Sequence, residues 1–141
     1  MKQDRRKLAR LQRLARIRSV ARHDAAARAA QAEDVFARII ALDGQTNALA
    51  RRYETREQCR DAESLRQLGT FVSALRAMGA ETGRQIETAR SDADASQSEL
   101  AWAERRRVVV EDRARGLRMV LEKRTAATPT GASRRFGTLL D

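Results

Sequence analysis

The chain has 141 residues, of which 34% are charged and 4% are aromatic, and its formal net charge is +10. This composition supplies too little bulk for the thick core of a globular enzyme and is compatible with a single unit. The single cysteine, Cys59, excludes an internal disulfide and fits a reducing compartment. No stretch approaches the roughly 18 apolar residues that cross a bilayer, so we expect a cytoplasmic protein without membrane insertion.

Residues 4 to about 56 are predicted to form one long helix. An apolar residue recurs there in steps of three and four, and no proline precedes Pro129 to end a helix. These positions form a predicted seam, the stripe that would face a partner helix. Its members are Leu11, Leu14, Arg18, Ala21, Ala25, Arg28, Ala32, Val35, Ile39, Leu42, Thr46, Leu49, Tyr53 and Arg56.

Residues 57–64 are polar and are predicted to form a turn. Ser64 is followed three residues later by Gln67, a spacing typical of a capping box, so the second helix is expected to start at Leu65. No glycine or proline marks this turn. An alternative is therefore a helix that continues through it, giving one long rod that pairs with a second copy.

The second predicted helix, residues 65–124, carries the more regular seam. A heptad register kept over so many turns requires a left-handed supercoil around a partner helix. The first helix can supply that partner. The predicted fold is thus all-α, a long antiparallel two-helix coiled-coil hairpin over residues 1–124. The apolar members of this seam are Leu65, Leu68, Val72, Leu75, Ile86, Ala89, Ala93, Leu100, Ala103, Val110, Ala114, Leu117 and Leu121.

The position of the turn also predicts a register between the two helices. A turn near residue 60 places Tyr53 opposite Leu68 and Val35 opposite Ile86. Residues 125–141 contain Pro129 and are predicted to form a flexible C-terminal tail.

Positive charge is concentrated in two segments. Residues 1–28 hold ten Lys or Arg against two acids, and residues 104–124 hold eight against four, whereas residues 29–103 hold nine against twelve. A hairpin would bring the two basic segments together. Such an end suits a protein partner with an acidic surface; a nucleic acid or a membrane surface is an alternative partner. Nucleic acid is disfavoured because no aromatic residues are interleaved with the basic ones for base stacking.

No pattern in the sequence indicates catalysis. His23 is the only histidine and lies in an Ala/Arg run, and no Cys/His metal spacing or Gly-rich phosphate loop occurs. We therefore expect no enzyme activity, no catalytic residues, no metal and no cofactor. The remaining alternative is a homodimeric structural coiled coil.

Three short segments resemble a known family. Leu49 and Tyr53 form a Leu-x-x-x-Tyr pair, Phe71 and Leu75 form a Phe-x-x-x-Leu pair after the turn, and Trp102 is followed four residues later by two arginines. With the basic hairpin of about 140 residues, these features resemble the FliJ family of flagellar export proteins and its YscO-type injectisome counterparts. The likeness covers residues 1 to about 124.

This resemblance implies a non-enzymatic stalk of the type III protein export apparatus, which serves flagellum biogenesis and motility. Such a stalk links the cytoplasmic ATPase ring to the export gate, a membrane protein with a cytoplasmic domain, and aids delivery of substrates or chaperones. The implied protein is a monomer at the cytoplasmic side of the inner membrane, with the export ATPase and its regulator as partners. The residues implied to face the ring are Arg5, Arg6, Arg10, Arg13, Arg105, Arg106 and Arg107, and the gate candidates are Tyr53, Phe71, Leu75 and Met78.

Overall fold

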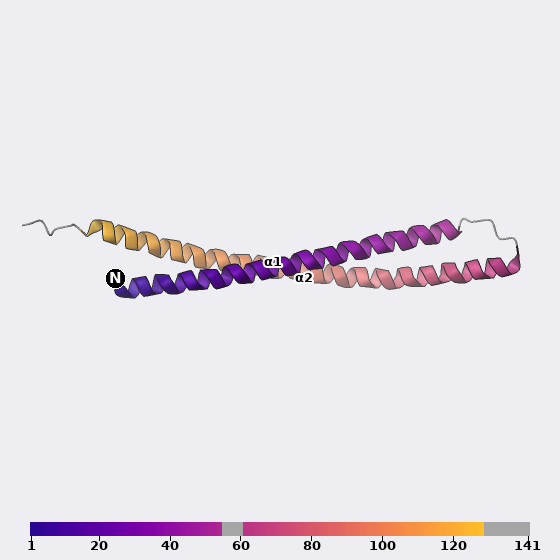
Figure 1. Ribbon diagram of the computed structural model, residues 1–141, viewed down its shortest axis with the longest axis horizontal. Coiled ribbons are helices and arrows are strands. Elements are labelled where there is room, and N and C mark those ends of the chain that lie inside the picture. Colours follow the sequence, from indigo (N-terminus) through magenta and orange to yellow (C-terminus); the bar gives the residue numbers. More distant parts are fainter. Residues whose placement is uncertain (55–60, 129–141) are drawn as a thin grey trace, which may run out of the picture. The chain divides into compact units, whose positions relative to one another are not determined.

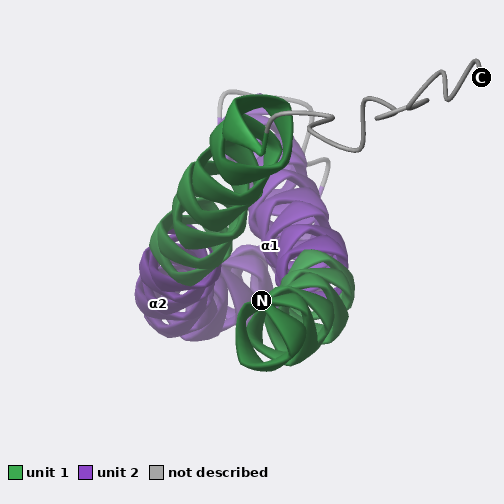
Figure 2. Ribbon diagram, turned by 90° about the vertical axis from the view of Figure 1, so that its left-hand side faces the viewer, with its two compact units in different colours: residues 1–21, 104–141 green, residues 22–103 purple. Residues whose placement is uncertain are grey.

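The protein is two long helices that pack against each other as a helical hairpin. A computed structural model describes residues 1–54 and 61–128, with α1 spanning Lys2–Glu54 and α2 spanning Ala62–Ala127 (Figure 1). The predicted all-α hairpin is confirmed. The chain divides into two compact units (Figure 2). Unit 1 comprises residues 1–21 and 104–141, and unit 2 comprises residues 22–103.

The start of α2 differs from the prediction. Asp61, rather than Ser64, caps the helix, because its Oδ1 accepts a hydrogen bond from the backbone N–H of Ser64 at 2.8 Å. Hydrogen bonds from the Ser64 side chain and backbone hold the pKa of Asp61 below its ordinary value. The expected cap at Ser64 is wrong, and the helix begins three residues before Leu65.

The start of α1 and the end of α2 lie close to their predicted places. Helix α1 begins at Lys2 and carries Asp4 in its first turn and Arg51 and Arg52 in its last, the charges that a helix dipole favours. Residues 55 and 56 of the predicted first helix and residues 57–60 of the predicted turn lie outside the described residues. Helix α2 continues to Ala127, three residues into the predicted tail.

The two helices run antiparallel within unit 2, as three contacts show. Arg28 Nε lies 3.7 Å from Glu99 Oε2, the Gln97 amide donates to Glu33 at 3.4 Å, and Arg76 pairs with Glu54. Residue numbers therefore rise along α1 while they fall along α2.

The predicted register is wrong by roughly one to two helical turns. The Tyr53 ring packs edge-to-face against Phe71 rather than Leu68, with ring centroids 4.9 Å apart. Because Glu54 pairs with Arg76, the first turns of α2 extend beyond the described part of α1. Leu65 belongs to these turns and is 60% exposed, although the predicted seam buried it.

The seam predicted for α2 otherwise forms the packed face of unit 2. Leu75, Ala89 and Ala93 are buried at this face. Thr82 is buried there too, since its hydroxyl donates to the Met78 carbonyl at 2.8 Å and thereby satisfies its polar group.

At every second position of the α1 seam, the residue that packs against α2 is the one that follows the predicted residue. Ala29 and Ala50 are buried and Phe36 is half-buried, whereas the predicted neighbours Val35 and Leu49 are exposed. Leu42 and Arg28 are exposed as well. The prediction followed the recurrence of Val35, Leu42 and Leu49 at every seventh residue. The structure instead places alanines between the helices, which allows close approach of the backbones.

Unit 1 pairs residues 1–21 with the end of α2. Leu121 and Val110 are buried, and Leu8 and Leu11 are half-buried. Arg124 donates to Asp4 at 2.9 Å across the two segments. The two basic segments of the sequence therefore lie side by side, as the hairpin prediction required.

Candidate binding surfaces

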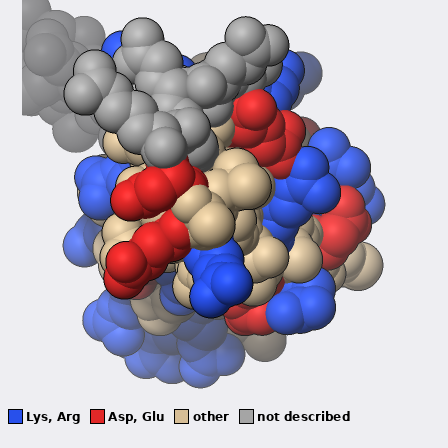
Figure 3. Space-filling view, turned by 90° about the vertical axis from the view of Figure 1, so that its right-hand side faces the viewer, with Lys and Arg blue, Asp and Glu red and all other residues tan. Residues whose placement is uncertain are grey.

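Unit 1 concentrates the positive charge of the chain. It holds eighteen Lys or Arg against six Asp or Glu, whereas unit 2 holds eleven against thirteen. At the end of unit 2 where α2 begins, acidic and basic side chains are interspersed (Figure 3). The structure places six of the seven basic residues implied to face the ring at the surface of unit 1: Arg5, Arg6, Arg10, Arg13, Arg105 and Arg106.

Arg107 is the exception among these residues. It lies half-buried at the seam, where its guanidinium donates to Glu104 and, at 2.9 Å, to Glu111. These hydrogen bonds, Glu104 first, raise the pKa of Arg107 above its ordinary value. The charge of Arg107 is thus compensated within α2, and the residue is a poor candidate for contact with an external acidic surface.

Arg18 is the second arginine at the seam of unit 1. The residue is half-buried, and its Nε is buried without a hydrogen-bond partner among the described residues. Burying a polar atom in this way costs free energy, so the burial of Arg18 Nε is a destabilising feature of this unit.

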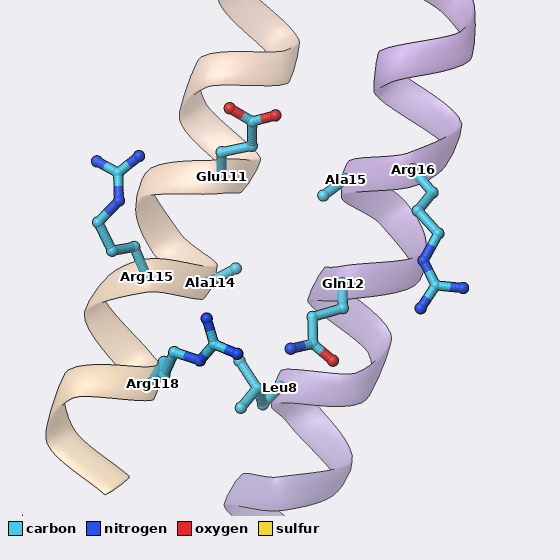
Figure 4. A pocket seen from close by; sticks show the side chains of 8 residues that line it. All are labelled: Leu8, Gln12, Ala15, Arg16, Glu111, Ala114, Arg115 and Arg118. Atoms are coloured by element: carbon cyan, nitrogen blue, oxygen red, sulfur yellow. The ribbon is translucent and has the colours of Figure 1, made fainter. Parts of the chain in front are cut away.

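A groove runs between the helices of unit 1 on one side of the seam (Figure 4). Its volume is about 480 Å³. Leu8, Ala15 and Ala114 supply apolar surface, while Gln12 and Arg118 extend into the space between the helices. The remaining lining residues are Arg16, Glu111 and Arg115. Sequence reasoning missed these flanking arginines, although each follows a seam position by one residue.

The gate candidates in unit 2 fall into two classes. Leu75 is 8% exposed and belongs to the packed face, so it serves the fold. Phe71 is 42% and Met78 is 55% exposed, and Tyr53 supports Phe71 through the edge-to-face contact. Phe71 and Met78 therefore remain the accessible members of the predicted set.

Additional apolar residues lie on the same side of unit 2 as Phe71 and Met78. Arg28 and Glu99, which form an ion pair, each precede a seam residue by one position, so this pair identifies one side of the hairpin. Phe71 and Met78 likewise each precede a seam residue of α2 by one position. Three exposed residues on α1 do so as well, and with them they form what we call the apolar flank: Val35, Leu42, Leu49, Phe71 and Met78.

The opposite side of unit 2 carries the Gln97–Glu33 hydrogen bond and the Arg76–Glu54 ion pair, and Arg90 lies over the Phe36 ring at 5.8 Å. Sequence reasoning missed the α1 residues of the apolar flank because it assigned them to the seam. The alternation of Val35, Leu42 and Leu49 with Phe36 and Ala50 is the signal that distinguishes a second stripe.

Across residues 1–54 and 61–128, no three His, Cys, Asp or Glu residues cluster as a metal site would require. The described helices also include none with the length and apolar character of a membrane span. What the arrangement offers chemically is two binding surfaces, one cationic and one apolar.

No protein-family model matches this chain, and no curated protein or solved structure is significantly similar to it.

Proposed function

We propose that this protein is a non-enzymatic stalk of a type III protein export apparatus of the flagellar kind. In this role unit 1 binds the cytoplasmic export ATPase, and the apolar flank of unit 2 binds the cytoplasmic domain of the export gate. The protein acts at the cytoplasmic side of the inner membrane and aids delivery of substrates or chaperones.

The observation that carries the proposal is the unlike character of the two units of one helical hairpin. Unit 1 is strongly basic and unit 2 is slightly acidic with exposed Phe71 and Met78. A coupling protein needs two separate binding surfaces of different chemistry. The likeness of the Tyr53, Phe71 and Trp102 segments to the FliJ family supports the same role.

The positive charge of unit 1 predicts how its contact with the ATPase should depend on salt. Cations at the rim of an interface chiefly raise the association rate and make binding salt-dependent. Arg5, Arg6 and Arg10 are exposed in unit 1 and suit this role. The gate contact, in contrast, would depend on apolar burial at Phe71 and Met78 and would respond weakly to salt.

The first experiment measures stimulation of the export ATPase from the same organism. Replacing Arg5, Arg6 and Arg10 by Gln is expected to weaken stimulation about tenfold. The matched control replaces Arg38, Arg66 and Arg84, exposed residues of unit 2, and removes the same charge. An equal effect of both variants, or no stimulation by the unmodified chain, contradicts the proposal.

The second experiment measures binding to the gate domain. Phe71→Ala and Met78→Ala are expected to weaken binding, whereas Ile40→Ala is not. Ile40 is 46% exposed but follows the seam residue Ile39, and so lies on the opposite side of unit 2. If the Phe71 and Met78 variants bind as the unmodified chain does, the assignment of the apolar flank is wrong.

A further inference from the structure

Within residues 1–21 and 104–128, one face of unit 1 combines exposed cations with exposed aliphatic side chains and contains no acidic residue. In unit 1 the residues of α1 that face α2 are Leu8, Leu11, Ala15 and Arg18, and each member of this face precedes one of them, or a seam residue of α2, by one position. The members therefore lie on the side opposite to the groove, whose polar residues follow such positions. We call this set the acid-free face. It consists of Lys7, Arg10, Ile17, Arg106, Val109, Arg113, Val120 and Lys123.

The aliphatic residues of this face are not used by the fold. Ile17 is 62%, Val109 is 48% and Val120 is 44% exposed. The predicted seam of the first helix likewise contains Arg18 and not Ile17. The structure shows that Leu8 and Leu11 face α2, whereas Ile17 does not.

The five acids of unit 1 that lie within residues 1–21 and 104–128 form ion pairs outside this face. Glu104 and Glu111 pair with Arg107, and Glu122 pairs with Arg118 on the groove side. Asp112 pairs with Arg115, and Asp4 pairs with Arg124. In residues 1–54 and 61–128, the face cations Lys7, Arg10, Arg113 and Lys123 form no ion pair. They are therefore available to an external anion.

Cations alternating with exposed aliphatic groups favour one class of anionic partner. A nucleic acid offers phosphates but little aliphatic contact area, and this face has no aromatic ring on which a base could stack. A bilayer of anionic phospholipids offers both a negative surface and an apolar boundary just beneath it. Long Arg and Lys side chains reach the headgroups while shorter aliphatic ones enter the boundary.

We propose that the acid-free face of unit 1 binds the surface of an anionic phospholipid bilayer. The two helical segments lie along the surface, the cations pair with lipid phosphates, and Ile17, Val109 and Val120 enter the headgroup region. This inference is independent of the proposed function, since it needs neither the ATPase nor the gate.

The test is flotation of the full chain with vesicles, using about 30% phosphatidylglycerol in phosphatidylcholine and, separately, phosphatidylcholine alone. Binding to the anionic vesicles is expected to be at least about tenfold tighter. Arg10→Gln with Arg113→Gln is expected to weaken it about tenfold, since each cation near an anionic surface contributes up to about fivefold. Ile17→Ser with Val109→Ser is expected to weaken it several-fold.

Matched controls remove the same groups from other sides of unit 1. Arg16→Gln with Arg115→Gln neutralises two groove residues, and Val20→Ser with Val108→Ser removes two exposed aliphatic side chains outside the face. These pairs are expected to change binding less than about twofold. Far-UV circular dichroism of each variant verifies that the helices are intact.

Three results would overturn the proposal. The first is equal loss of binding in the face variants and their controls. The second is no effect of the Ile17 and Val109 substitutions, which would indicate a purely electrostatic contact. The third is a DNA duplex that binds more tightly than the vesicles with the same dependence on Arg10 and Arg113.

Discussion

Leu65 and Leu75 give a matched test of the packed face of unit 2. Both lie on α2 in the same heptad register, but Leu65 is 60% exposed and Leu75 is 8% exposed. Replacing a buried leucine by alanine costs about 2–5 kcal/mol. The seam between two helices is thin and can partly close, so we expect about 2–3 kcal/mol for Leu75→Ala. Leu65→Ala should cost less than about 0.5 kcal/mol.

Thermal and urea unfolding, followed by far-UV circular dichroism, measure this difference. A loss of 2–3 kcal/mol lowers the midpoint of a chain of this size by about 5–10 °C. Urea gives the free energy of unfolding by linear extrapolation. Equal destabilisation by the two substitutions would refute the register, because it would mean that α1 covers the first turns of α2.

Four further predictions concern capping, the seam arginine, the pairing of the terminal segments and the oligomeric state. The pKa of Asp61 is depressed below 3.8, so the cap should stabilise α2 above that pH and should be lost as the pH falls through the pKa of the folded state. The chemical shift of the Ser64 amide in an NMR titration should report this loss. Asp61→Asn should abolish the titration. Arg107→Leu alone should lower the thermal midpoint, because it leaves Glu104 and Glu111 without their cation, and adding Glu104→Gln and Glu111→Gln should recover the loss; an unchanged midpoint for the single variant would contradict this role of the arginine. A double-mutant cycle that exchanges Asp4 and Arg124 should give about 0.3–1 kcal/mol of coupling that declines with salt; zero coupling at low salt would contradict the pairing. Light scattering should give the mass of a monomer, and a dimer would favour the structural coiled-coil alternative.

The sequence predicts the hairpin because the α2 seam keeps one heptad register from Leu65 to Leu121. Leu75, Ala89 and Ala93 fall on this register and are buried. Helix α1 is different. Val35 and Phe36 are adjacent, as are Leu49 and Ala50, so two apolar stripes on α1 compete for the packed face. Which stripe is buried depends on how closely the two backbones approach, which no local pattern specifies.

The candidate surfaces also differ in how far the sequence predicts them. The basic character of unit 1 is predictable from charge counted along the chain, and so is the pairing of Arg107 with acids three residues before and four residues after it. The apolar flank and the acid-free face depend on which side of each helix faces its partner. Neither surface can be identified without knowing which residues of α1 pack against α2, and the structure supplies that information.

The central claim, that the two units bind different partners of an export apparatus, is tested most directly by photo-crosslinking in the organism that makes this protein. A photoreactive residue replaces Arg13 in unit 1 or Met78 in unit 2, both of which are exposed. We predict that the probe at position 13 crosslinks to the export ATPase and the probe at position 78 to the cytoplasmic domain of the gate. Crosslinks from both positions to one partner, or to neither, would contradict the claim.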